Sequence, residues 1–271
     1  MAKKTLSEMS FLDHLEELRW LLVRSTSAVL IMAVVTYFFS DFIFDTILFA
    51  PTSPNFFTYT FFCELSNKIG FADSICITEL PFIIQNTSME GQVNMFIWTC
   101  ITAGFILAFP FILWELWKFI SPALYEKERK NVRVFIFVAS ILFFLGVLFG
   151  YYVIVPMSIN FCATFSISKM VQNQFTIDSY ISMIKTSVIA SGLFFELPVI
   201  IYFLTKLGLV TPTFLRKYRK YSVVIVLLIS AIVTPPDVVS QIIVAIPMLL
   251  IYEASIFISV FVYKNKIKEN V

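Results

Sequence analysis

The segment VNMFIWTCITAGFILAFPFILWELW, residues 93–117, decides the fold, because it holds one charged residue, Glu115, in 25 positions. A helix needs about 20 apolar residues to cross the ~30 Å hydrocarbon core of a bilayer, and this segment is long enough. The whole chain has the matching composition, with 59% apolar residues, 31 phenylalanines and 14% charged residues. A soluble protein of this size would expose large apolar patches. The bulk of the chain is therefore expected in lipid.

Further apolar runs predict an all-α polytopic membrane protein that forms a single domain over residues 1–271. The last two runs are the short ones, and Thr234-Pro-Pro-Asp237 separates them, since adjacent prolines cannot lie inside a helix. The six spans are predicted at 21–39, 93–117, 132–155, 181–207, 221–233 and 238–263, with an amphipathic helix at 10–20 and an outer loop at 41–92.

The basic residues predict the orientation of these spans. With six crossings, 17 of the 20 Lys and Arg lie in segments that share one side with the N-terminus. Cytoplasmic loops carry this excess of positive charge. Both termini are therefore predicted in the cytoplasm.

Several function classes are excluded by what the sequence lacks. It holds no phosphate-binding glycine motif, so ATP use is not expected. A net charge of +2 is too small for a nucleic-acid binder. With one histidine, His14, and no C-x-x-C spacing, neither a metal site nor another cofactor is expected. The chain also shows no nucleophile–base constellation, so it is not predicted to be an enzyme.

Glu196 is the most informative single residue, because it lies near the middle of the fourth span. An ionisable group at that depth is costly and usually faces a cavity or a partner. Pro198 removes a backbone hydrogen bond, so a kink is expected beside it. A protonated Glu196 bonded to a neighbouring helix is the alternative interpretation.

Other polar residues have simpler interpretations. Glu115 and Lys118 have the i,i+3 spacing of a helix-surface pair. Asp237 could cap the sixth span, and Glu253 could be neutralised by Lys264 or Lys266. In the outer loop, Cys63 and Cys76 are either a disulfide, which would close a loop of about a dozen residues, or two free thiols.

Taken together and in this order, several motifs resemble TatC, the multi-span subunit of the twin-arginine protein translocase. The resemblance covers nearly the whole chain, although the outer loop is distinctive and Glu115 stands where many members carry an amide. The motifs are His14-Leu-Glu-Glu-Leu-Arg19, Ala50-Pro51, Phe119-Ile-Ser-Pro-Ala-Leu-Tyr125 with Glu128-Arg129, Phe195-Glu-Leu-Pro198, and Val233-Thr-Pro-Pro-Asp-Val-Val-Ser-Gln241 followed by Ala245-Ile-Pro-Met248.

The resemblance implies a cupped bundle that binds signal peptides with paired arginines on folded cargo proteins. Glu17 and Glu128 would form the cytoplasmic site for the arginines, and Arg19 and Phe119 would flank it. Two carboxylates suit this task, because each can clamp a guanidinium with two charge-assisted hydrogen bonds.

The resemblance also implies roles for residues at other depths, and it implies partners. Glu196 would polarise the concave face within the membrane, while Pro51, Asp237 and Gln241 would act at the outer side. Single-span Tat subunits of the TatA and TatB type would assemble with the chain, which would be oligomeric in the complex. The proton-motive force would supply the energy, and the protein would lie in the bacterial cytoplasmic membrane.

The alternative function is a proton- or ion-coupled transporter of small solutes that uses Glu196. Such folds often contain internal repeats, and none is visible in this sequence.

Overall fold

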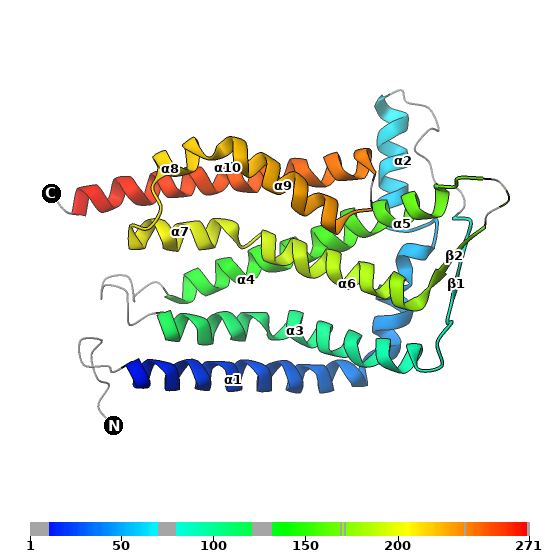
Figure 1. Cartoon of the computed structure of the whole chain (residues 1–271), viewed down its shortest axis with the longest axis horizontal. Coiled ribbons are helices and arrows are strands. Elements are labelled where there is room, and N and C mark those ends of the chain that lie inside the picture. The colour runs from blue at the N-terminus through cyan, green and yellow to red at the C-terminus, as the bar shows by residue number, and fades with distance from the viewer. Residues whose placement is uncertain are drawn as a thin grey trace. The chain divides into compact units, whose positions relative to one another are not determined.

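The computed structural model describes residues 11–69, 80–120, 132–168, 170, 172–235 and 237–269. The described chain is almost entirely helical (Figure 1). Its elements are α1 (Phe11–Phe38), η2 (Phe42–Leu48), η3 (Ala50–Thr52), α2 (Phe57–Ile69), β1 (Phe82–Gln85), α3 (Gly91–Ile120), α4 (Val132–Phe149), η6 (Gly150–Ile154), α5 (Val155–Thr164), β2 (Asn173–Thr176), α6 (Ile177–Phe194), α7 (Leu197–Leu207), α8 (Pro212–Lys217), α9 (Arg219–Val233) and α10 (Val238–Glu269).

Within the described residues, five helical segments are long and apolar enough to cross a membrane. They match five of the six predicted spans. The fifth predicted span is α9, whose 15 residues give about 22 Å of helix, so the prediction that it is short is confirmed. The five segments are His14–Phe38, Gly91–Ile120, Val134–Thr164, Ile177–Leu207 and Ser240–Lys264.

Three predicted boundaries differ from the structure. The predicted short sixth span is wrong, because α10 has 32 residues and continues as helix through its lysine-rich end. The third span continues beyond residue 155 into α5, and the π-helical turn η6 precedes Pro156, which lacks the N–H that a regular helix needs there. The segment predicted as a separate amphipathic helix at 10–20 is continuous with the first span in α1.

The chain divides into two compact units, and the first comprises Met1–Ser40 and Phe96–Leu142. In this unit 1, α1 packs antiparallel against α3. A Cβ added at Gly104 would lie 2.6 Å from the backbone nitrogen of Ala33, so the two helices meet backbone to backbone. Nearby, the Thr36 hydroxyl donates to the carbonyl of Cys100 at 3.0 Å. A residue without a side chain is therefore what allows this helix pair to approach so closely.

The second unit, unit 2, comprises Asp41–Met95 and Phe143–Val271. Its apolar core includes Ile154, Phe194 and Met248. The predicted outer loop is largely ordered as η2, η3, α2 and β1. Strand β1 pairs in parallel with β2, which follows α5 (Figure 1). The sequence analysis missed this small sheet, because two four-residue strands carry no clear alternation.

We predict that Gly104→Ala destabilises the packing of α1 on α3. The added methyl group would collide with backbone atoms rather than with a movable side chain, and overpacking of this kind costs about 1–3 kcal/mol. Thermal unfolding in detergent measures the effect. The half-exposed Leu107 on the same helix supplies the control, since Leu107→Ala creates no clash; equal stability of both variants would contradict the close approach.

Candidate functional site

The inner end of unit 1, which we define as the end that carries His14 and Phe119, holds the predicted peptide-binding residues that the structure describes. Glu17 and Arg19 are exposed on α1, and within the described residues neither has an ion-pair partner. Phe119, near the end of α3, stacks on the imidazole of His14 with ring centroids 4.5 Å apart. Glu128 lies outside the described residues. The structure therefore brings Glu17, Arg19 and Phe119 to one end of one helix pair.

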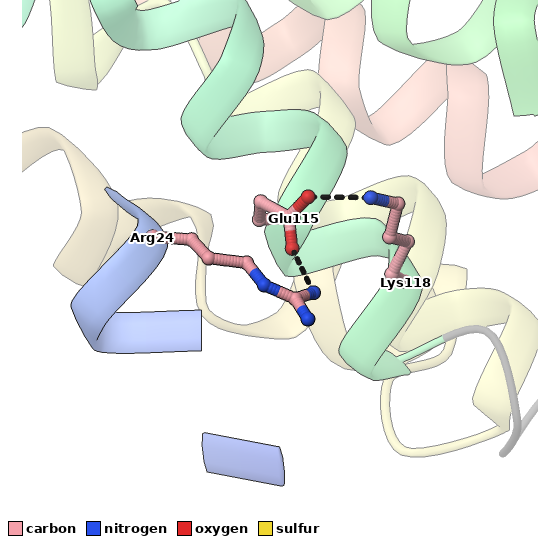
Figure 2. A network of polar contacts seen from close by, with 3 residues as sticks. All are labelled: Arg24, Glu115 and Lys118. Carbon is pink, nitrogen blue, oxygen red and sulfur yellow. Dashed lines mark hydrogen bonds and ion pairs between the residues drawn. The ribbon is translucent and has the colours of Figure 1, made fainter. Parts of the chain in front are cut away.

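Glu115 lies on α3 about one turn from Phe119, and its charge is neutralised. The side chain is only 4% exposed, and each of its oxygens meets a different cation (Figure 2). Arg24 of α1 donates to Oε2 at 3.2 Å, and Lys118 of α3 donates to Oε1. The predicted i,i+3 pair with Lys118 is confirmed, whereas Arg24 was not anticipated. Glu115 is thus an internal counter-ion and not a free acid.

Glu196 lies in unit 2 at a break in the fourth span, where α6 ends at Phe194 and α7 begins at Leu197. Pro198 at the start of α7 causes the break, since it cannot donate to the carbonyl of Phe194; the predicted kink is confirmed. The Glu196 side chain is buried, with 5% exposed. Among the described residues its Oε1 has no hydrogen-bond partner. A buried carboxyl without a partner is costly, which is typical of a functional group.

Close packing holds this break in place. A Cβ on Gly146 of α4 would lie 2.6 Å from the carbonyl oxygen of Ser191 on α6. The Ser191 hydroxyl donates in turn to the carbonyl of Gly146 at 2.8 Å. Phe195 packs against Phe149, with ring centroids 5.5 Å apart. The position of Glu196 is therefore set by contacts on the turn immediately before it.

Asp237 and Gln241, which the sequence predicts at the outer side, connect the last two helices of unit 2. The Asp237 carboxylate accepts from the backbone N–H of Ser240 at 2.8 Å, which is an N-cap for α10. The Gln241 amide donates to the carbonyl of Leu227 on α9 at 3.0 Å. The cap that the sequence suggested is confirmed, and Gln241 adds a cross-helix link.

Pro51 is fully buried in η3, the turn that follows η2. Its carbonyl accepts from the Tyr59 hydroxyl at 3.0 Å, and that hydroxyl also lies 3.2 Å from the carbonyl of Pro156. Burial raises the pKa of the Tyr59 phenol above its ordinary value, so the group remains a donor. Pro51 thus contributes to the packing of the outer segment.

Two further predictions have different outcomes. Cys63 is disulfide-bonded, but Cys76 lies outside the described residues, so the Cys63–Cys76 pairing stays a prediction. Glu253 pairs with Arg219 at 2.6 Å and not with Lys264; the side chain of Lys266 lies outside the described residues, so its expected role stays a prediction. Arg219 begins α9, which packs beside α10 (Figure 1), and this contact between helices was invisible in sequence spacing.

The described residues contain no group of three acids, histidines or cysteines that could hold a metal ion. Unit 1 presents the exposed carboxylate of Glu17 at the helix end that also carries the His14–Phe119 stack. Unit 2, taken by itself, holds the buried carboxyl of Glu196. Sequence reasoning missed the roles of Arg24 and His14. For Arg24 the sequence did hold one signal. A tryptophan precedes a basic residue by four positions twice, at Trp20 and Arg24 and again at Trp114 and Lys118.

Comparison with known proteins gives one consistent family. The family described as Sec-independent protein translocase protein (TatC) matches residues 13–247. TatC of Blattabacterium sp. subsp. Periplaneta americana is 42% identical over 265 residues, covering 97% of this chain and 100% of that protein. TatC of Aquifex aeolicus is 33% identical over 259 residues, covering 95% and 98%. A crystal structure of the twin arginine translocase receptor TatC is similar with a TM-score of 0.70 at 32% identity, covering 92% of this chain and 99% of that one.

We predict that Asp237→Ala lowers stability by about 1 kcal/mol, because the Ser240 N–H loses its acceptor. Asp237→Asn keeps an oxygen at the same place and is expected to unfold at nearly the native temperature. Thermal unfolding of both variants in detergent tests this. An Asn variant as unstable as the Ala variant would show that the carboxylate charge matters, and not the cap.

Proposed function

Because the chain belongs to the TatC family of Sec-independent protein translocase proteins, we propose that it is the receptor subunit of a twin-arginine translocase. It binds the paired-arginine signal peptides of folded cargo proteins at its cytoplasmic face. The observation that carries this proposal is the exposed carboxylate of Glu17, which has no ion-pair partner among the described residues and lies at the inner end of unit 1, where Phe119 also lies. It acts as a transport subunit and not as an enzyme.

Recognition of the arginines rests on charge and shape. A carboxylate can accept two parallel hydrogen bonds from one guanidinium, which a lysine ammonium cannot reproduce. Glu17 takes one arginine and Glu128 takes the other. Glu115 does not compete, since both of its oxygens already bind cations of the same unit.

The Phe119 ring gives the site its apolar surface. Its stacking on His14 fixes the ring between the end of α3 and the first turns of α1. Signal peptides carry an apolar stretch after the charged residues, and an aromatic ring stacked on His14, one helical turn before Glu17, suits that sequence. Arg19, exposed two residues after Glu17, repels a misplaced cation and so favours one register.

Transport requires more than docking, and Glu196 supplies the group within the membrane. Its buried carboxyl, with one oxygen unpartnered among the described residues, can bind a polar group of a single-span Tat partner subunit. The proton-motive force supplies the energy. Pro51, Asp237 and Gln241 keep the outer segment and the last two helices in the arrangement that the partners meet.

We predict that Glu17→Gln weakens binding of a twin-arginine peptide at least tenfold, because a hydrogen bond to a charged group is worth about 1.5–3 kcal/mol. Fluorescence anisotropy with a labelled peptide measures this in detergent. Glu16 is the matched control, since it is an equally exposed acid one residue earlier, and Glu16→Gln is expected to change affinity less than about threefold.

A photocrosslinker placed next to the peptide's arginines gives an independent readout. It should label residues near Glu17 and Phe119, and replacing the peptide arginines by lysines should abolish the labelling. Labelling elsewhere that survives the lysine replacement would reject the proposed site.

We predict that Glu196→Ala leaves peptide affinity within about threefold of the native value but strongly reduces transport. The reason is that Glu196 lies in unit 2, within a membrane span, and is not part of the docking site. Export of a folded reporter and peptide binding are measured on the same variant, with Glu196→Gln as the conservative control. Equal loss of docking and transport would refute this division of roles.

A further inference from the structure

Two basic side chains at the inner end of unit 1 face outward beside tryptophans. The Cζ atom of Arg24 lies 5.9 Å from the ring centroid of Trp20, which precedes Arg24 by one turn on α1. The Nζ atom of Lys118 lies 5.7 Å from the ring centroid of Trp114, which precedes Lys118 by one turn on α3. The side chains of Arg24 and Lys118 are 55% and 50% exposed. The pattern of an aromatic residue followed four positions later by a cation therefore occurs on both helices of the same pair.

Glu115 joins these two cations into one group (Figure 2). Because Arg24 and Lys118 bind the two oxygens of one buried carboxylate, they are held close together. The group keeps a net charge of +1. An arginine has five N–H donors and a lysine three, and the carboxylate engages one of each. Among the described residues the other donors of this group have no hydrogen-bond acceptor, so they can meet an anion from outside.

The surface that adjoins the cations is apolar and exposed. On α3 the stripe Leu107, Phe111 and Trp114 leads up to Lys118, at the helical spacing of one face, and each of these side chains is at least 37% exposed. On α1, Trp20 and Ile31 lie on the exposed face that also carries Arg24. Lys118 therefore lies at the end of the apolar stripe on α3, and Arg24 lies between Trp20 and Ile31 on the exposed face of α1.

We propose that Arg24 and Lys118 bind the phosphate headgroup of an anionic phospholipid of the inner leaflet, with Trp20 and Trp114 at the level of the headgroups. Tryptophan prefers that interface, and basic groups at an inner leaflet attract anionic lipid. The acyl chains lie along the exposed apolar stripes. A soluble phosphate would make no use of those stripes, which is why a lipid is the ligand.

The Glu115 carboxylate has a positioning role in this site. It holds the guanidinium and the ammonium together so that one phosphate can contact both. Its negative charge is offset by the two cations that it binds, so the group as a whole attracts the headgroup. This role also accounts for an acid at a position where the sequence analysis found no function.

Native mass spectrometry of the full-length chain in detergent tests the proposal, with phosphatidylglycerol and phosphatidylcholine of identical acyl chains as probes. The informative variant is R24Q/E115Q/K118Q, which removes the charges but keeps hydrogen-bonding amides at all three positions. We expect at least about tenfold weaker binding of phosphatidylglycerol, since each basic side chain at an anionic surface contributes roughly fivefold, and unchanged binding of phosphatidylcholine.

The matched control is R216Q/K217Q, which removes two exposed cations from α8 and should change affinity less than about twofold. Lys118→Gln alone, which leaves the pair of Arg24 and Glu115 intact, should weaken binding severalfold and covers the case in which the triple variant does not fold. Equal losses in the control, or equal binding of the two lipids, would overturn the proposal. Displacement of phosphatidylglycerol by excess inorganic phosphate would show a soluble-anion site instead.

Discussion

The interaction on which the rest depends is the neutralisation of Glu115 by Arg24 and Lys118. A buried carboxylate without partners would be expensive inside a helix pair, and here each oxygen has its own cation. Because this acid is neutralised internally, the proposed binding of the cationic ligand falls to Glu17 instead. The same contacts join α1 to α3 near the inner end of unit 1, where His14 and Phe119 stack.

The two buried acids of the chain illustrate different solutions to one constraint. Glu115 is paired within its own unit, so it serves structure. Glu196 is equally buried, yet one of its oxygens has no partner among the described residues, and it sits where Pro198 interrupts the helix. A group left in that condition is available to a partner that arrives later, which fits the proposed assembly with single-span subunits.

Hydropathy and proline placement could predict five of the spans, the short α9 and the break at Glu196, because these depend on local composition. Contacts between distant segments could not be predicted in the same way. Arg24 lies 91 positions from Glu115, and Arg219, the partner of Glu253, belongs to another helix. The length of α10 was also missed. The apolar run ends before Lys264, but the helix continues through the lysines to Glu269. The motifs supplied Glu17, Arg19 and Phe119, whose common placement depends on the antiparallel packing of α1 and α3.

The most direct test of the account is a double-mutant cycle between Glu17 and an arginine of the signal peptide, measured by calorimetry on the full-length chain. Replacing the peptide arginine by glutamine in combination with Glu17→Gln should give a coupling energy of at least about 1 kcal/mol. The same cycle with Glu115→Gln should give less than about 0.5 kcal/mol. Coupling to Glu115 that equals or exceeds the coupling to Glu17 would contradict the account, because it would mean that the neutralised acid and not the free one binds the arginine.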